Sequence, residues 1–229
     1  MHTLTHFRLC PHSRSIRLLL GEIGLEVRLV EQRPWEYRQE LLAINPAGEL
    51  PVLALDNGPV LCGVYATSEY IAEELKRHPI DGRPVPLFPG TREERAEVRR
   101  LVDWFHGKLN REATREFLEE KVYRGYRGGG APDVAILRAV RANLRYHLSY
   151  IAYLAHERRW LAGDDMSFAD LAAAAHLSTL DYLGEVPWEE FDAAKQWYAR
   201  LKSRPAFRPL LADRISGTPA PVHYTDLDF

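Results

Sequence analysis

The hydrophobic pattern of the chain changes once, at a proline-rich stretch, and this change limits the folds that are open to it. Before residue 78, short β-branched runs alternate with helical patterns, whereas beyond residue 90 the apolar spacing is helical. Proline lacks a backbone donor and resists helix, so residues 78–90 (HPIDGRPVPLFPG) predict a connector. We therefore predict an α/β domain over residues 1–80, a linker over 81–90, an all-helical domain over 91–213 and an extended tail over 214–229.

The first 80 residues have the element order of a thioredoxin-like domain. Residues 3–8 and 26–31 predict two strands, joined by a helix that opens at Cys10-Pro11-His12 and ends at Gly24. Asp56-Asn57-Gly58 predicts a hairpin between runs 52–55 and 59–61, because Asn-Gly tolerates the positive φ of such turns. Residues 68–75 predict a helix. The order β-α-β, hairpin, α favours a mixed sheet whose first two strands are parallel.

The second half predicts a helical bundle. Apolar residues at helical spacing mark helices over 98–109 (continuing toward 122), 137–151, 167–183, 188–201 and 205–212. Residues 125–133 hold three adjacent glycines and predict a loop. The helix over 167–183 is apolar nearly all round, so we expect other helices to surround it.

Composition excludes several classes of function. The net charge is −2 and the 30 Lys and Arg residues are dispersed, so we expect no nucleic-acid partner. The apolar runs are shorter than the ~18 residues of a membrane span, and the first residues lack the pattern of a signal peptide. Two cysteines outside any paired framework, Cys10 and Cys62, predict reduced thiols and a cytoplasmic protein. The histidine spacings predict no metal site, and His176 is interpreted as a hydrogen-bonded core residue.

Four motifs then occur in a family's order and at about its spacing. They are Cys10-Pro11-His12-Ser13, Asn45-Pro46-Ala47-Gly48-Glu49-Leu50-Pro51-Val52-Leu53, Trp160-Leu161-Ala162-Gly163 followed by Ser167-Phe168-Ala169-Asp170, and Ser203-Arg204-Pro205-Ala206-Phe207. With these motifs, residues 1 to about 213 resemble the glutathione transferase superfamily. The resemblance implies a thioredoxin-like domain followed by a helical transferase domain.

The resemblance also implies positions for a glutathione site. Cys10 would be the catalytic thiol of an enzyme, and a helix N-terminus would stabilise its thiolate. Leu50 and a cis Pro51 would present backbone to the extended peptide glutathione. Ser167 and Asp170 form a capping box, which is structural and worth about 1 kcal/mol.

One position departs from the family pattern. In typical members an acidic or amide residue precedes the serine that opens the third helix, and the two hold the γ-glutamyl end of glutathione. Here Ser68 is present but Thr67 stands before it, and Glu69 is rotated ~100° away. Losing a charge-assisted contact weakens binding by about 1.5–3 kcal/mol, which is about tenfold to a hundredfold. The glutathione positions Cys10, Leu50, Pro51, Thr67 and Ser68 are therefore interpreted as vestigial.

Two other features favour a binding role. Trp35, between a proline and charged residues, predicts a half-exposed ring suited to a dimer seam or a partner. The tail ends in aromatic or aliphatic residues that alternate with acidic ones, and exposed apolar groups need burial somewhere. The tail residues that we predict to contact a partner are Tyr224, Asp226, Leu227, Asp228 and Phe229.

The whole chain, including the tail, resembles a bacterial branch of the superfamily that localises with the tubulin-like GTPase FtsZ. This resemblance implies a homodimer that binds FtsZ at the division site, organises or curves its filaments and uses no cofactor. The alternative is a Cys-type glutathione transferase or thiol reductase that acts through Cys10 with glutathione. A third hypothesis is a redox-responsive adaptor in which glutathionylation of Cys10 alters partner binding.

Overall fold

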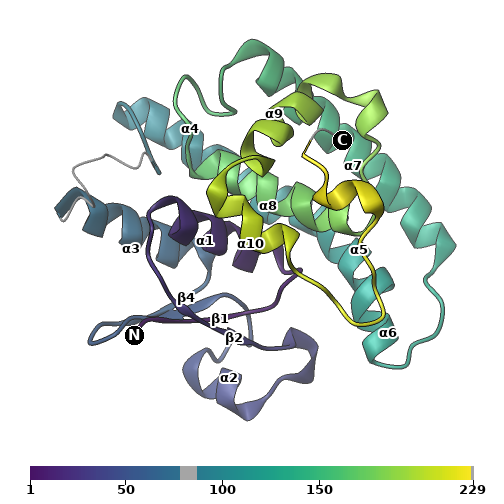
Figure 1. Ribbon diagram of the computed structural model, residues 1–229, viewed down its shortest axis with the longest axis horizontal. Helices are drawn as coiled ribbons and strands as arrows, with labels where there is room; N and C mark the ends of the chain where they lie inside the picture. Colours follow the sequence, from purple (N-terminus) through teal and green to yellow (C-terminus); the bar gives the residue numbers. More distant parts are fainter. Residues whose placement is uncertain (78–86, 228–229) are drawn as a thin grey trace.

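A four-stranded mixed sheet and a helical domain lie side by side in the computed structural model, which describes residues 1–77 and 87–227 (Figure 1). The strands are β1 (Thr3–His6), β2 (Arg28–Glu31), β3 (Val52–Ala54) and β4 (Val60–Cys62), in the order β2-β1-β3-β4. β1 is parallel to β2 and antiparallel to β3, and β3 and β4 form the predicted hairpin. Asn57 in its turn has φ 56°. The thioredoxin-like prediction is confirmed.

Three helices complete the first domain: α1 (Pro11–Glu22), α2 (Gln39–Ile44) and α3 (Val64–Arg77). α1 begins where predicted, with Pro11 in its first turn, and Gly24 follows it at φ 71°. α3 begins four residues before the prediction, and the short α2 was not predicted at all. α2 spans six residues, which is fewer than two helical turns and too short to show a helical period.

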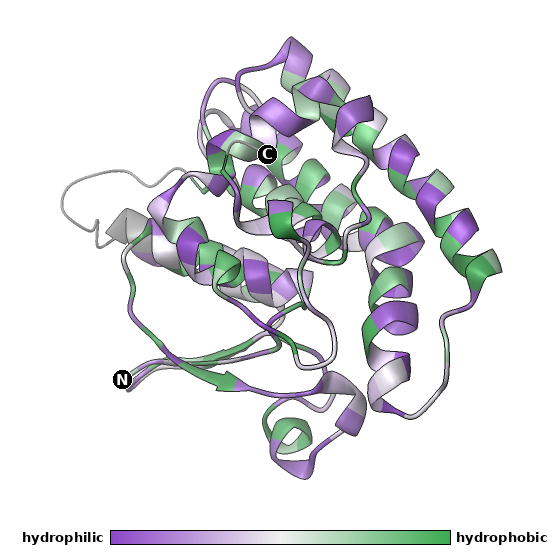
Figure 2. Cartoon of the chain, turned by 45° about the vertical axis from the view of Figure 1, so that its right-hand side comes forward, coloured by the Kyte–Doolittle hydropathy of each residue, from purple (hydrophilic) through white to green (hydrophobic). Residues whose placement is uncertain are grey.

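The helical domain contains a continuous run from α4 (Arg92–Asp103) through two π-helical segments, Trp104–Thr114 and Glu119–Tyr123, to α6 (Arg124–Tyr126). The short α5 (Arg115–Leu118) separates the two π-helical segments. α7 (Val134–Glu157), α8 (Phe168–Tyr182), α9 (Asp192–Lys202) and α10 (Arg208–Leu211) follow. In Figure 2, polar and apolar residues alternate along α7 as expected for a helix with one buried face.

α8 is the central helix of this domain, as its composition predicted, because all of its residues are buried. Its capping box is formed: the Ser167 hydroxyl accepts from the backbone of α8, and the Asp170 carboxylate accepts from Ser167 N at 2.9 Å. Asp170 also accepts from Leu161 N and from the indole of Trp197. The carboxylate therefore joins three segments of the bundle.

The two domains meet where α1 packs against α8. Gly21 of α1 lies against Ala206, so closely that a Cβ at position 21 would be 2.9 Å from the Ala206 Cβ. The Arg14 side chain of α1 is fully buried at the same boundary. The domains therefore share one continuous core.

Two other predictions change in the structure. The helix expected over 188–201 is a 3-10 turn at Trp188–Glu190 followed by α9, and the tail contains a 3-10 turn at Val222–Thr225. Most of the predicted linker, residues 81–86, lies outside the described residues. Among the described helices none is both long and apolar enough to cross a membrane.

Candidate functional site

Cys10 is the N-cap residue of α1, at the end of the segment that follows β1. It is buried, and its Sγ is 4.0 Å from the carbonyl oxygen of Leu50. The Leu50–Pro51 peptide bond is cis, as the resemblance implied. The first two glutathione motifs are thus brought together, although they are 40 residues apart in sequence.

The thiol of Cys10 is paired with the imidazole of His12. Burial alone would raise the pKa of Cys10, but the hydrogen bond from His12 and its positive charge outweigh burial, and the pKa is lowered. Burial likewise opposes the charged form of His12, yet its contact with Cys10 raises the pKa of the imidazole. The pair therefore favours a thiolate beside an imidazolium, which is the reactive form of a cysteine.

A cavity of about 390 Å³ opens beside Cys10 between the two domains. Its wall includes His12, Glu49, Asn110, Arg115 and Trp35. The indole of Trp35 stacks on Tyr126, with ring centroids 5.2 Å apart, and is 4.5 Å from the ring of Tyr123. Trp35 is half-buried as predicted, but the structure places it in the wall of the cavity.

The positions that would hold the γ-glutamyl end of glutathione are turned toward their own helix. The Thr67 hydroxyl donates to Gly63 O at 2.7 Å, and the Ser68 hydroxyl donates to Tyr65 O at 3.1 Å. Glu69, the nearest carboxylate in sequence, accepts two hydrogen bonds from Arg99 at 2.7 and 2.9 Å. Glu69 therefore points elsewhere, as expected, and does not replace the missing acid.

A histidine cluster lies behind His12, and sequence spacing did not reveal it. His12 (α1), His106 (first π-helical segment) and His176 (α8) have ring nitrogens within 4.8 Å of one another. His176 is a hydrogen-bonded core residue, as predicted, with its Nδ1 2.9 Å from Thr114 Oγ1. The three residues come from three separate helices, so no local sequence pattern could signal the cluster.

The tail lies across the helical domain and is held by buried contacts (Figure 1). Tyr224 is fully buried, and its hydroxyl accepts from Arg14 at 3.1 Å and donates to Leu210 O at 2.9 Å. The backbone oxygen of His223 accepts a hydrogen bond from Lys202. Nε2 of the His223 ring lies 3.1 Å from a carboxylate oxygen of Asp181. Tyr224 was predicted to contact a partner. In this structure it anchors the tail instead, because an aromatic ring at the end of a helical domain is stabilised by burial.

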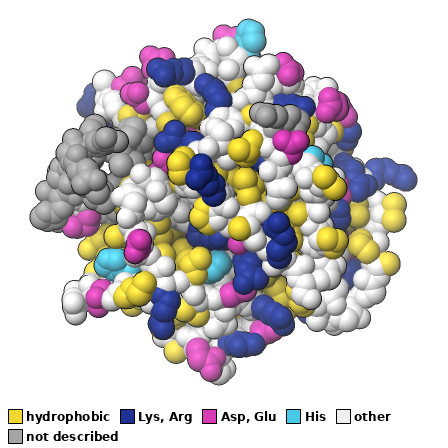
Figure 3. Space-filling view, in the orientation of Figure 1, with side chains coloured by type: hydrophobic (Ala, Val, Ile, Leu, Met, Phe, Trp, Pro, Cys, Tyr) yellow, Lys and Arg dark blue, Asp and Glu magenta, His cyan; other side chains and the backbone are white. Residues whose placement is uncertain are grey.

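The residues beyond that anchor reach the surface. Asp226 is exposed, and Leu227 is 43% exposed. Asp228 and Phe229 lie outside the described residues. On the face drawn in Figure 3, basic and acidic side chains are intermixed, with apolar side chains between them. The structure therefore presents an acidic and apolar end of the tail to solvent.

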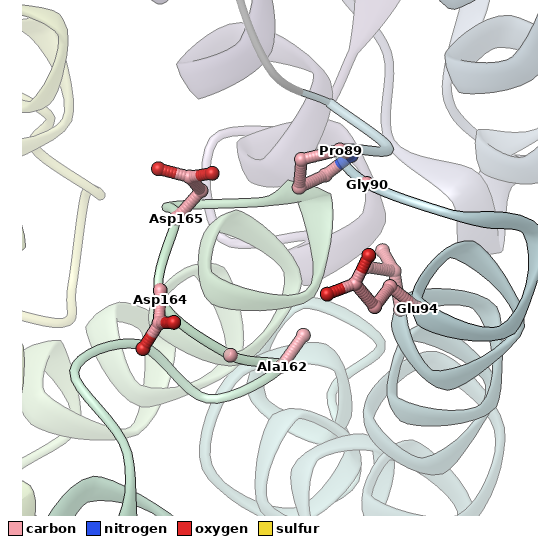
Figure 4. A pocket seen from close by; sticks show the side chains of 8 residues that line it. Pro89, Gly90, Glu94, Ala162, Asp164 and Asp165 are labelled. Carbon is pink, nitrogen blue, oxygen red and sulfur yellow. The ribbon is translucent and has the colours of Figure 1, made fainter.

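A smaller hollow of about 110 Å³ lies between α4 and the loop before α8 (Figure 4). Glu94, Asp164 and Asp165 surround it. The Glu94 carboxylate accepts from Thr91 N and completes the capping box of α4. Gly90 has φ 80°, a backbone conformation that favours glycine, and a Cβ there would also displace the Glu94 carboxylate. Glu94 thus has a structural role at the start of the helix.

Comparisons with known proteins agree with this geometry. The profile of the glutathione S-transferase N-terminal domain matches residues 4–79, and that of the C-terminal domain matches residues 128–205. FtsZ-localized protein A of Caulobacter vibrioides is 47% identical over 230 residues, covering 99% of this chain and 98% of that protein. Glutathione S-transferase 2 of Saccharomyces cerevisiae is 29% identical, covering 89% of this chain and 87% of that protein.

Solved structures extend the similarity to the whole fold. The crystal structure of a glutathione S-transferase from Sinorhizobium meliloti superposes with a TM-score of 0.93 at 47% identity, covering 100% of both chains. The structure of FzlA from C. crescentus gives the same TM-score and identity, covering 100% of this chain and 99% of that one. The chain belongs to the glutathione S-transferase family.

Proposed function

We propose that this protein is a non-catalytic, transferase-fold homodimer that binds FtsZ and organises or curves its filaments at the division site. The observation that carries the proposal is the likeness to FtsZ-localized protein A, which extends over nearly the full length of both chains, tail included. A two-fold dimer would present two equivalent tails, so that one dimer could engage two FtsZ subunits or two filaments.

The exposed end of the tail supports a partner surface. The buried hydrogen bonds of Tyr224 hold the chain in place just before Asp226 and Leu227, whose side chains are exposed. Pre-ordering a short segment lowers the entropy that binding costs. The tail is therefore suited to contact a partner through both charge and apolar area.

The state of the glutathione site supports a role other than catalysis. Glu69, the nearest carboxylate in sequence, does not take the place of the family's acid at position 67, because it is paired with Arg99. Thr67 is buried and donates to Gly63 O. A ligand ammonium would gain no charge-assisted contact from either side chain.

Co-sedimentation with GTP-assembled FtsZ tests the proposal. Deletion of residues 226–229 removes the exposed Asp226 and Leu227 together with the last two residues, while Tyr224 keeps its buried contacts. Asp228→Lys reverses a single charge. We expect the affinity for FtsZ polymers to fall at least about tenfold in both variants, the effect of losing ~1.4 kcal/mol of contact. Circular dichroism and analytical ultracentrifugation should show an unchanged fold and dimer.

Glu40→Lys is the matched control, because Glu40 is an exposed acid on α2, remote from the tail in Figure 1. It should bind FtsZ as the wild type does. Wild-type co-sedimentation of the deletion variant would reject the tail as a binding surface, and no co-sedimentation of the wild-type protein would reject the function.

The Cys10–His12 pair favours a second candidate, a Cys-type glutathione transferase or thiol reductase. A lowered thiol pKa beside a 390 Å³ cavity is what such an enzyme requires. This candidate predicts micromolar to millimolar glutathione binding and turnover that is lost in Cys10→Ala. Calorimetry without heat at millimolar glutathione would exclude it.

A further inference from the structure

We propose that His12, His106 and His176 form a three-imidazole site for a divalent zinc ion, in the wall of the cavity beside Cys10. The inference does not depend on FtsZ binding, and its site shares His12 with the Cys10–His12 pair. It rests on the packing of three helices rather than on a sequence motif.

The spacing of the ring nitrogens is close to that of a zinc site. His106 Nδ1 and His176 Nε2 are 3.1 Å apart. Zinc–nitrogen bonds of 2.0–2.1 Å at tetrahedral angles require about 3.3 Å between ligand atoms. A ring nitrogen of His12 lies within 4.8 Å of the other two. To complete the triad, His12 must leave its present contacts with Cys10 and with the backbone oxygen of His106, which lies 3.2 Å from its Nε2.

The surrounding hydrogen bonds resemble an outer shell. Zinc-binding histidines generally donate their second N–H to a backbone carbonyl, a carboxylate or another polar group, which fixes the ring. His176 Nδ1 is 2.9 Å from Thr114 Oγ1, which leaves Nε2 facing the cluster. Thr114 ends the first π-helical segment, and such segments are frequent at functional sites.

The hydrogen bonds of His106 are incomplete in the metal-free arrangement. Its ring is 3% exposed, and its Nε2 has no hydrogen-bond partner although it is buried. A buried polar atom without a partner is costly, so its presence needs an explanation. This Nε2 is distinct from Nδ1, the atom that lies 3.1 Å from His176 Nε2, so coordination through Nδ1 would leave Nε2 without a partner.

Metal binding requires neutral imidazoles, so zinc must displace the proton that the contact with Cys10 favours on His12, and its affinity should fall as the pH decreases. Three imidazoles without a carboxylate match zinc and exclude the oxygen-seeking ions Mg²⁺ and Ca²⁺.

The cavity gives the ion a way in. His12 lines it, whereas His106 and His176 lie behind His12. An ion held by three imidazoles keeps a fourth position open for water or a ligand.

Calorimetric titration of the full-length protein with ZnCl₂, in a reductant without thiols, tests the site. We expect one zinc per chain, and a loss of affinity of at least about tenfold in His12→Gln and in His106→Gln. Substitution of Co²⁺ should give the intense visible absorption of a tetrahedral site in the wild type only.

His6→Gln is the matched control, because His6 is also buried and also has an unpartnered ring nitrogen. It should bind zinc as the wild type does. If the His106 variant fails to fold, Thr114→Val tests the outer shell, and a loss of about tenfold to a hundredfold is expected. No stoichiometric binding, or equal binding by the His12 and control variants, would overturn the proposal. Loss of binding in Cys10→Ser with retention in His176→Gln would also overturn it, since the ion would then lie at Cys10.

Discussion

The guanidinium of Arg14 donates a hydrogen bond to the phenolic oxygen of Tyr224 at 3.1 Å, across 210 residues of sequence. Arg14 lies in the first helix and Tyr224 in the tail, and both side chains are fully buried. A second guanidinium nitrogen of Arg14 donates to the Asp213 carboxylate at 3.3 Å, so the buried positive charge of Arg14 is paired with a negative one. The tail is thus part of the core that joins the two domains.

Tyr224→Phe should lower the free energy of unfolding by about 1–3 kcal/mol, because it leaves the Arg14 donor and the Leu210 carbonyl without this partner. Urea denaturation measures the loss, and hydrogen exchange over residues 215–227 should accelerate. Tyr153→Phe is the control: Tyr153 is 60% exposed, so its change should stay within about 0.5 kcal/mol. Equal stability of both variants would mean that the buried contact contributes nothing.

Gly21→Ala should destabilise the protein by about 1–3 kcal/mol, because the added methyl would lie 2.9 Å from the Ala206 Cβ at the domain boundary. Gly125→Ala is the control, since a Cβ at this helical position meets nothing within 4 Å. Alanine there should be neutral or stabilising by up to about 1 kcal/mol. Thermal unfolding of the two variants measures the difference, and similar shifts would contradict close packing at Gly21.

His12→Ala should slow alkylation of Cys10 by iodoacetamide at pH 7. Burial would still raise the pKa of the thiol, while the hydrogen bond and charge that lower it would be gone. A rise of one pKa unit reduces the thiolate fraction about tenfold, so we expect at least that decrease in rate. Both proteins should carry Cys62→Ser so that one thiol reacts. An unchanged rate would show that His12 does not activate Cys10.

The stability of the wild type should fall as the pH decreases from 6.5 to 4. Burial, and then the charge of Arg17, lower the pKa of His6 from 6.5 to about 4. In this window the unfolded state binds the proton and the folded state does not, so acid favours unfolding by up to about 3 kcal/mol. Above pH 6.5 the contribution is fully present.

His6→Gln should remove this dependence. The difference in unfolding free energy between wild type and variant should therefore change between pH 7 and pH 4.5, in favour of the variant at low pH. Urea denaturation at the two pH values measures it, and a pH-independent difference would show that His6 has an ordinary pKa.

The sequence predicted a structural element correctly where that element is determined by residues close to one another in the chain. The Asn57 turn, the proline at the start of α1 and the Ser167–Asp170 box each depend on residues within a few positions of one another. The short α2 escaped prediction because a helix of six residues spans fewer than two turns and has no measurable period.

The candidate site also has features that the sequence predicted and features that only the structure shows. The motifs located Cys10, Leu50 and Pro51, and the structure brings them together. The departure at Thr67 was visible in the sequence, but only the fold shows that Glu69 is engaged by Arg99.

The sequence by itself thus determined the order of elements, the transferase-type motifs and the alternating acidic and apolar end of the tail, since these depend on short-range chemistry. The tertiary structure alone decided that Tyr224 is an anchor and that His12, His106 and His176 meet. The physical reason is that helix periodicity fixes which face of a helix is apolar. Which distant side chains share that buried space depends on how the helices cross.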